Sequence, residues 1–178
     1  MNGKWFWWGE GNCTAEEYVQ LWKETVHLLR DKHKLNNLIY AYSPNKLNPF
    51  DNYMKYYPGD NYVDILGIDI YDFKKSENFA NSIVSNLALV KQIATFKNKL
   101  FAFTETGLET ISTENWYSEV LYPVIKDSGI AWVLFWRNHV KTHHYMPFKG
   151  HTSEGDFKRF KSFPKTLFLK DLPNINQY

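Results

Sequence analysis

The alternation of short apolar runs with longer helical segments is the feature that most constrains the fold of this 178-residue chain. Strands that follow one another with a helix between them must lie parallel, because each connection has to return to the same end of the sheet. The alternation therefore predicts an α/β fold with a parallel sheet, either open or closed into a barrel. The apolar runs that suit buried strands are 38–42, 62–71, 100–104 and 130–136.

Three segments carry the spacing of amphipathic helices. The first is predicted over 14–34, because Thr14-Ala15-Glu16-Glu17 has the pattern of a capping box. The second is predicted over 78–97, and the third begins at a Thr113 cap and ends at Gly129. The residues expected on the apolar faces of the second and third helices are Phe79, Ile83, Leu87, Val90 and Ala94, and Trp116, Val120, Leu121 and Val124.

The number of strands limits the size of any barrel. Four strands are well supported, and Trp5–Trp8 has the composition expected at the end of a fifth. A barrel of eight strands needs about 250 residues. The chain therefore holds an open sheet, or a barrel without its first half, and either arrangement makes residues 1–178 a single domain.

Composition separates the candidate classes of function. Aromatic residues make up 18% of the chain, while the formal net charge is only +2. Nucleic-acid-binding proteins usually carry a basic patch, so we expect a sugar ligand and no nucleic acid. The one cysteine, Cys13, cannot form an internal disulfide. The run 130–136 is too short to cross a bilayer and residues 1–10 lack the features of a signal peptide, so no membrane partner is expected.

Reactive groups of parallel α/β proteins lie at the carboxyl ends of the strands. Glu105 closes the run 100–104, so its carboxylate should face the open end of the sheet. A strand-end glutamate paired with Arg137 or a lysine explains its position equally well. Asp69 and Tyr71 lie two residues apart on one strand and share a face, which would bring a carboxyl group and a phenol near Glu105.

Aromatic and basic side chains add to this set. Trp136 and Arg137 end the last strand and offer a stacking surface beside a fixed positive charge, with burial of Trp136 in the core as the alternative. The run Trp5–Trp8 has too many rings for one face, so some should line a cleft, unless they pack against other chain segments. His139 and His143 have i, i+4 spacing, but no further ligands accompany them, so no metal site is expected.

Four short motifs occur in a fixed order: Asn2-Gly3-Lys4-Trp5-Phe6-Trp7-Trp8-Gly9, Gly67-Ile68-Asp69-Ile70-Tyr71, Thr104-Glu105-Thr106-Gly107 and Trp136-Arg137-Asn138. Each alone is weak, but together they resemble glycoside hydrolase family 26 over nearly the whole chain. The resemblance implies a (β/α)8 TIM barrel, of which this chain would hold about strands 5–8 and the tail of strand 4.

The resemblance also implies roles for individual residues. In this family the fourth strand supplies the acid/base and the seventh supplies the nucleophile, which corresponds to Glu105 here. The loop His144-Tyr145-Met146-Pro147 resembles the segment after the eighth strand. The positions that match the surroundings of the sugar next to the scissile bond, and hence the implied substrate-binding residues, are Trp5, Asp69, Tyr71, Trp136 and Arg137.

The sequence departs from the family at one decisive point. The fourth-strand motif His-Glu-x-Asn-Gly is matched only from x onward, where Met1 stands, so the acid/base glutamate would precede Met1. Retaining glycosidases use two carboxyl groups about 5–5.5 Å apart, one as nucleophile and one as acid and base. Glu105 can take only the first role, and Glu10 lies beyond the aromatic run. We therefore expect the isolated chain to have little or no activity.

The resemblance implies a mannan endo-1,4-β-mannosidase that needs no cofactor or metal and cleaves β-mannan or manno-oligosaccharides with retention. Mixed-linkage β-glucan and β-1,3-xylan stay open as substrates, and a non-catalytic carbohydrate-binding remnant or an inert shortened product stays open as a different function. A half barrel exposes apolar helix faces and a free sheet edge, so we expect self-association. The sequence leaves the compartment of this chain unknown, while the parent enzyme is expected to be secreted, periplasmic or at the cell surface.

Overall fold

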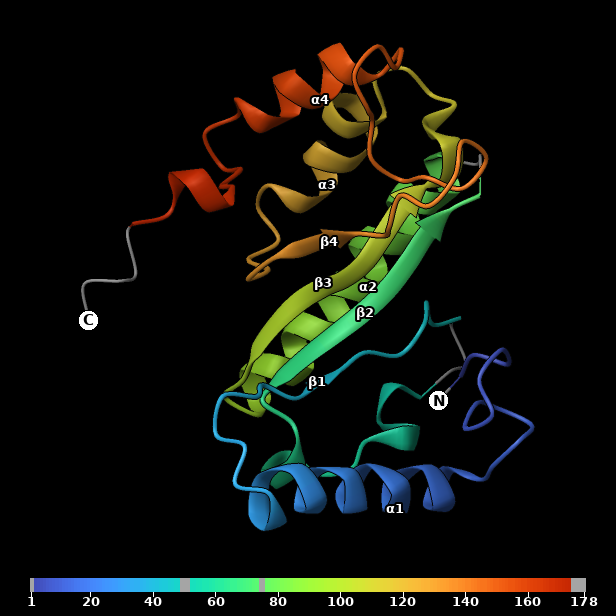
Figure 1. The fold of residues 1–178 in the computed structure, drawn as a ribbon, viewed down its shortest axis with the longest axis vertical. Coiled ribbons are helices and arrows are strands. Elements are labelled where there is room, and N and C mark those ends of the chain that lie inside the picture. Colours follow the sequence, from blue (N-terminus) through green and yellow to red (C-terminus); the bar gives the residue numbers. More distant parts are fainter. Residues whose placement is uncertain (1, 49–51, 74–75, 174–178) are drawn as a thin grey trace. The chain divides into compact units, whose positions relative to one another are not determined.

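The computed structural model describes residues 2–48, 52–73 and 76–173, which divide into two compact units (Figure 1). Strands β2 (Ile65–Asp72), β3 (Leu100–Leu108) and β4 (Val133–Phe135) and helix α2 (Ser76–Phe96) each pass from one unit into the other. A single domain for residues 1–178 stays a prediction. The first unit comprises Met1–Ile70, Ser85–Thr106 and Ile130–Leu134, and the second comprises Tyr71–Val84, Gly107–Gly129 and Phe135–Tyr178.

The described residues form a sheet of four strands in the order β1-β2-β3-β4. Strand β1 pairs in parallel with β2, with Ala41 opposite Ile65 and Tyr42 opposite Leu66. The predicted α/β class with a parallel sheet is therefore confirmed. The strands are β1 (Ala41–Tyr42), β2 (Ile65–Asp72), β3 (Leu100–Leu108) and β4 (Val133–Phe135).

Two strand boundaries differ from the prediction and change the setting of the site. Strand β1 is shorter than 38–42, because Tyr40 N donates to the Asp64 carboxylate at 2.8 Å rather than to a neighbouring strand. Strand β3 continues past Glu105 to Leu108, so the prediction that Glu105 closes the strand was wrong. Gly107, at φ +152°, adopts a backbone conformation that few other residues reach, and this lets the strand continue.

The aromatic run Trp5–Trp8 forms bends and a turn, so the predicted end of a fifth strand was wrong. The Phe6 carbonyl accepts from Gly9 N at 2.9 Å and from Asn12 Nδ2 at 2.7 Å. These local partners replace the ladder bonds that a strand would need from a neighbour. The Phe6 and Trp8 rings stack at 4.6 Å, which holds the turn closed.

Helix α1 (Ala15–Val26) begins where predicted. Glu17 N donates to Thr14 Oγ1 at 3.2 Å and Thr14 N donates to the Glu17 carboxylate at 2.8 Å, so the capping box is complete. The predicted span 14–34 is only partly α-helical, because the chain continues from Val26 as a π-helix over His27–Lys32.

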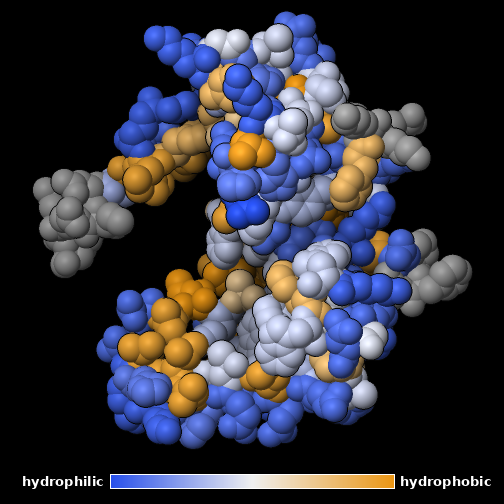
Figure 2. Space-filling model, turned by 45° about the vertical axis from the view of Figure 1, so that its right-hand side comes forward, coloured by the Kyte–Doolittle hydropathy of each residue, from blue (hydrophilic) through white to orange (hydrophobic). Residues whose placement is uncertain are grey.

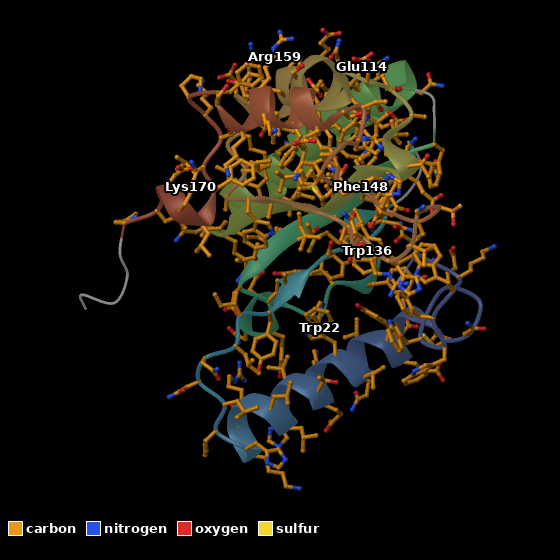
Figure 3. All side chains as sticks on the ribbon, turned by 45° about the horizontal axis from the view of Figure 1, so that its top comes forward. Trp22, Glu114, Trp136, Phe148, Arg159 and Lys170 are labelled. Atoms are coloured by element: carbon orange, nitrogen blue, oxygen red, sulfur yellow. The ribbon has the colours of Figure 1, made fainter. Side chains whose placement is uncertain are left out.

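The inner face of α1 packs on the first unit's own tyrosines. Tyr18 and Val26 are buried, and Trp22 lies between them at helical spacing (Figure 3). Trp22 Nε1 donates to the Tyr62 carbonyl at 2.8 Å, and the Trp22 ring lies 6.3 Å from the ring of Tyr42. These contacts hold α1 against β1.

Helix α2 (Ser76–Phe96) matches the predicted span of 78–97 closely, and all five residues predicted on its apolar face are buried. The third predicted helix is divided into a π-helix, Trp116–Leu121, and the short helix α3 (Tyr122–Ile125). Pro123 lacks an N–H group and cannot continue an α-helical ladder, which explains the division. Thr113 is not the cap, because Asn115 directly precedes the π-helix.

Helix α4 (Glu154–Lys161) was not predicted. Its buried Asp156 accepts from Tyr117 N at 2.8 Å and from Ser118 N at 3.3 Å, which holds α4 on the π-helix within the second unit. Over the described residues, no helix combines the length and apolar character that a membrane crossing requires. The short 3-10 helices are Tyr53–Tyr56, Asp60–Tyr62, Glu109–Ile111 and Leu169–Asp171.

Candidate functional site

In the first unit, a buried carboxyl group on β2 is held by hydroxyl groups from two other parts of the chain. Asp69 is only 8% exposed. Ser43 Oγ, just after β1, lies 2.6 Å from Asp69 Oδ1 and also hydrogen-bonds to Thr104 Oγ1 on β3. Thr104 Oγ1 in turn lies 3.0 Å from the Ile68 carbonyl oxygen. Three neighbouring segments of the sheet therefore meet at one carboxyl group.

The electrostatic surroundings of Asp69 favour its neutral form. Burial is the largest effect and raises the pKa of Asp69 to about 7, well above its ordinary value of 3.8. Hydrogen bonds from Ser43 and Thr104 lower this pKa, while the negative charge of Glu105 raises it. Glu105 is half-buried on β3, so its charge acts on a carboxyl group of the adjacent strand.

Gly67 makes room for this arrangement. A Cβ atom at Gly67 would lie 2.4 Å from both Thr104 Oγ1 and Thr104 Cγ2, closer than real contacts allow. The close approach of the Thr104 side chain therefore explains why the Gly-Ile-Asp-Ile-Tyr motif begins with a glycine, Gly67. Thr104 was predicted only as part of a motif, and no role was predicted for Ser43.

The first described residues are anchored beside Asp69. Asn2 Nδ2 donates to the Asn45 carbonyl at 3.0 Å, and Asn45 N donates to Asn2 Oδ1 at 2.9 Å. Asp69 N donates to the Pro44 carbonyl at 3.0 Å and Lys46 N donates to the Asp69 carbonyl at 2.8 Å, so the segment after β1 runs along β2. The Asn2 side chain thus ties the aromatic run to the strand that carries Asp69.

Trp5 lies at the surface of the first unit. Its side chain is 66% exposed, its ring centroid is 5.9 Å from that of Phe6, and it packs over the backbone of Gly3. An exposed ring fits a stacking role, which stays a prediction. Glu10, the other carboxyl group of this segment, lies 3.9 Å from Lys55 Nζ at the protein surface.

In the second unit, Tyr71 contacts an aromatic residue that the sequence analysis did not select. The rings of Tyr71 and Tyr145 meet edge to face at 5.5 Å. A Cβ atom at Gly107 would lie 2.4 Å from Tyr145 Cδ1, so glycine is required where Tyr145 packs. Tyr117 Oη donates to the Tyr145 carbonyl at 2.7 Å, which fixes Tyr145 from its other side.

The loop after β4 is organised by Asn138. Its Oδ1 accepts from the backbone N–H groups of Tyr145 and Met146, each at 2.9 Å, and its Nδ2 donates to the Met146 carbonyl at 2.9 Å. Trp136 is half-buried and Arg137 is exposed at the start of this loop (Figure 3). Full burial of Trp136 in the core is thus ruled out, and the substrate-binding roles of both residues stay predictions.

His143 of the second unit has a carboxylate partner and lies in a turn. His143 Nδ1 lies 2.7 Å from Glu109 Oε1, and His143 N donates to the Val140 carbonyl at 2.9 Å in a tight turn. The i, i+4 spacing of His139 and His143 is therefore not helical. In the part of the chain that the structure describes, no cluster of three His, Cys, Asp or Glu side chains could hold a metal ion.

Comparison with known proteins explains why these motifs occur together. The model of glycosyl hydrolase family 26 matches residues 1–119. The chain belongs to glycosyl hydrolase family 26. The match includes Asp69, Thr104 and Glu105 and the aromatic run, so the resemblance drawn from the motifs is confirmed.

Two curated relatives match further parts of the chain. The chain is 33% identical over 187 residues to a mannan endo-1,4-beta-mannosidase of Bifidobacterium adolescentis, covering 93% of this chain and 19% of that protein. It is 38% identical over 124 residues to a mannan endo-1,4-beta-mannosidase of Bacillus subtilis strain 168, covering 66% of this chain and 31% of that protein.

Solved structures match almost the whole chain. A family 26 β-mannanase of Bacteroides ovatus superposes with a TM-score of 0.89 at 39% identity, covering 95% of this chain and 49% of that one. The catalytic domain of a family 26 endo-β-1,4-mannanase from Bacillus sp. JAMB-750 gives 0.88 at 37% identity, covering 99% of this chain and 51% of that one. The chain thus spans about half of these structures, and the predicted partial (β/α) barrel is confirmed.

Proposed function

We propose that this chain forms the part of a retaining endo-1,4-β-mannanase that supplies the nucleophile, Glu105, and not the acid/base. The observation that carries the proposal is that half-buried Glu105 on β3 acts electrostatically on a buried carboxyl group, Asp69, of the adjacent strand. The mannanase names of relatives at 33–39% identity support β-1,4-mannan as the substrate class.

The chemistry follows from a single ionised carboxylate. A Glu105 oxygen attacks the anomeric carbon, the bond to the leaving oxygen breaks, and a glycosyl ester on Glu105 results; water then releases the sugar with its configuration retained. Expelling a sugar alkoxide requires a proton from a second carboxyl group. Glu10 lies at the protein surface, 3.9 Å from Lys55 Nζ. We propose that this chain does not supply the second carboxyl group and cleaves mannan slowly or not at all.

An activated substrate tests the nucleophile without the acid. An aryl β-mannobioside with a good leaving group releases a phenolate that needs no protonation, and azide can replace the activated water. We expect phenol release that azide accelerates, with β-mannobiosyl azide as the product. Glu105→Gln should lower the rate at least about a thousandfold.

A matched variant makes this experiment decisive. Glu114 is an exposed carboxylate of the second unit (Figure 3), and Glu114→Gln should leave phenol release unchanged. Equal rates for the parent chain and Glu105→Gln would exclude Glu105 as the nucleophile. An α-configured azide product would exclude a retaining mechanism.

Carbohydrate binding without turnover is the second candidate function. The exposed rings of Trp5 (66%) and Trp7 (68%) favour it, because exposed tryptophan rings can stack on sugar faces. Calorimetry with mannohexaose distinguishes the two functions: binding that survives in Glu105→Gln but disappears in Trp5→Ala, without phenol release by the parent chain, would favour a binding role.

We also propose that the chain associates with a second copy of itself through the first unit. Side chains of α1 and of the aromatic run form an open groove of about 380 Å³, here called the aromatic groove. Further apolar side chains lie at the surface of the part of the molecule that contains α1 (Figure 2). Two identical apolar surfaces can cover one another about a twofold axis. The groove is lined by Trp7, Trp8, Tyr18, Leu21, Trp22, Thr25, Val26, Leu29 and Tyr40.

A further inference from the structure

In the second unit, a histidine uses one ring nitrogen and leaves the other without a partner. His143 Nδ1 lies 2.7 Å from Glu109 Oε1. A carboxylate oxygen only accepts, so His143 Nδ1 carries a proton and donates to Glu109. His143 Nε2 is buried and has no hydrogen-bond partner within the described residues. Burial without a partner is unfavourable for a polar nitrogen, so Nε2 calls for a group from outside the described residues.

The chemistry of Nε2 limits which group can bind there. In a neutral imidazole Nε2 accepts a proton, and in an imidazolium it donates one. A hydroxyl group both donates and accepts, so it fits either form. A metal ion would need further ligands, and the described ranges contain no cluster of three His, Cys, Asp or Glu side chains. The group that fits Nε2 is therefore an alcohol or a water molecule.

The His143 ring lies beside a tyrosine that also contacts a predicted substrate-binding residue. The rings of His143 and Tyr145 meet edge to face at 5.4 Å, and Tyr145 meets Tyr71 at 5.5 Å. The backbone of Tyr145 is fixed on both sides, by Asn138 at its N–H group and by Tyr117 at its carbonyl. His143 and Tyr71 thus contact one partly exposed ring that is held in place.

The turn that carries Glu109 is strained. Thr110 and Ile111 have φ values of +62° and +46°, and β-branched residues rarely adopt this left-handed region. Thr110 N donates to the His144 carbonyl at 2.8 Å, which ties the strained turn to the residue after His143. Strained backbone concentrates at binding sites, where surrounding contacts hold it. The strain is thus a second observation, independent of the unpartnered nitrogen, at the same pair of residues.

We propose that Glu109 and His143 form a sugar-binding subsite, in which His143 Nε2 binds a hydroxyl group of a β-1,4-mannan chain. Glu109 is a positioning residue, because it fixes the orientation of the imidazole and acts through it. The identity of the sugar chain rests on the proposed function. The side chains of His143 and Glu109 are 30% and 50% exposed, so the pair lies at the protein surface, where a polysaccharide can reach it.

Access to Nε2 requires a movement of a neighbouring side chain. Two aromatic rings adjoin that of His143, namely Tyr145 at 5.4 Å and His139 at 6.4 Å. Tyr145 is fixed, whereas His139 is exposed and its ring makes no hydrogen bond within the described residues. The proposal therefore includes rotation of the His139 ring when the sugar binds. His139→Ala should keep or increase the affinity for mannan chains.

Two amide substitutions test the role of Nε2 with mannohexaose in calorimetry. Asparagine places an amide group near the position of Nδ1, and glutamine places one near that of Nε2. His143→Asn should therefore lower the affinity about tenfold, while His143→Gln should lower it by no more than about threefold. His27→Asn is the matched control, because His27 Nδ1 lies 3.2 Å from Asp31 Oδ2 in a similar exposed pair of the first unit. It should leave the affinity unchanged.

Glu109→Ala tests whether the carboxylate acts through the histidine. It should lower the affinity about threefold in the parent chain and have no further effect in His143→Asn. Unchanged affinity in His143→Asn would overturn the proposal and assign a water molecule to Nε2. Equal losses in His143→Asn and His143→Gln would overturn it as well, because the ring would then only support its turn. A parent chain that does not bind mannohexaose would also refute the subsite.

A labelling experiment distinguishes failure of this inference from failure of the proposed function. A 2-deoxy-2-fluoro-β-mannosyl fluoride traps a retaining nucleophile as a stable ester while fluoride leaves without acid assistance. Mass spectrometry of the Glu105 peptide should show the ester in the parent chain and in His143→Asn. Labelled Glu105 with affinity that is independent of His143 would refute the subsite alone. Unlabelled Glu105 with affinity that depends on His143 would refute the nucleophile and retain the subsite.

Discussion

Asp69, Ser43, Thr104 and the Ile68 carbonyl, here called the Asp69 network, lie in the same unit as the aromatic groove. The two regions differ in whether their side chains have partners within the chain. Asp69 is 8% exposed, and its carboxyl group has a hydroxyl partner at 2.6 Å. The groove is lined by apolar atoms open to solvent, and Trp7 at its edge is 68% exposed. The first region is complete within the chain, while the second has apolar surface that another surface can cover.

This difference indicates which properties belong to a single molecule and which depend on association with a second one. Hydrogen bonds of the network join β1, β2 and β3 through local register, so the setting of Glu105 depends on the described residues. Burial of apolar surface does not depend on direction, and any complementary surface that covers it lowers the free energy. We therefore expect substitutions in the network to change the charge and stability of one molecule, and substitutions in the groove to change association.

The largest expected effect is a pH-dependent stabilisation by Asp69→Asn. The folded-state pKa of Asp69, about 7, exceeds its ordinary 3.8, so the folded chain binds this proton more tightly than the unfolded chain. The contribution of Asp69 to stability is then favoured at low pH and falls as the pH rises from about 4 to 7. Asparagine resembles the neutral acid, so Asp69→Asn should be more stable than the parent at pH 8 by up to about 4 kcal/mol and similar to it at pH 4.

Urea unfolding of both proteins at pH 4, 6 and 8 measures this effect. Asp171→Asn, at an exposed position of the second unit, is a control that should show no such trend. A stability difference between Asp69→Asn and the parent that does not change with pH would show that Asp69 is not neutral in the folded chain.

The sequence allowed the pair of carboxyl groups to be predicted, because strand alternation and strand order suffice to bring Asp69 and Glu105 together. It did not allow their partners to be predicted. Ser43 and Thr104 reach one another only through the register of β1 on β2 and of β2 beside β3. Register depends on tertiary contacts that no local pattern encodes. A glycine at position 67, opposite Thr104, was the one available signal of a close approach.

Predictions of secondary structure were wrong where the local sequence does not show which contacts the segment makes in the folded chain. Trp5–Trp8 has the composition of a strand, but its Phe6 carbonyl is used within a turn. Helix α4 was not predicted, because its buried residues are Phe160 and a charged one, Asp156, which do not form an apolar face. The capping box at Thr14 was predicted correctly, since both of its hydrogen bonds are local.

An intermediate effect is expected from Gly67→Ala. Its methyl group would lie 2.4 Å from two atoms of the Thr104 side chain, so either β2 or Thr104 must move and the Asp69 network must loosen. We expect a loss of about 2 kcal/mol in the free energy of unfolding. Gly155→Ala is the matched control, because nothing lies within 4 Å of the added methyl in helix α4. Equal stability of the two variants would mean that the contact between Gly67 and Thr104 does not constrain the site.

The smallest effect on stability, but the clearest effect on association, is expected from Trp7→Ser in the aromatic groove. Trp7 has one ring contact, edge to face with Trp8 at 5.1 Å, and most of its surface faces solvent. Its loss should therefore change the free energy of unfolding of the monomer by no more than about 0.5 kcal/mol. Sedimentation velocity over a range of concentrations should show a smaller associated fraction for Trp7→Ser than for the parent.

The control for this experiment is a second exposed apolar side chain outside the groove. Leu169 is 82% exposed in the second unit, so Leu169→Ser removes surface hydrophobicity without changing the groove. If both substitutions reduce association equally, general surface hydrophobicity rather than the groove drives it. A monomeric parent chain at every concentration would exclude self-association. A decrease confined to Trp7→Ser would assign the contact to the aromatic groove.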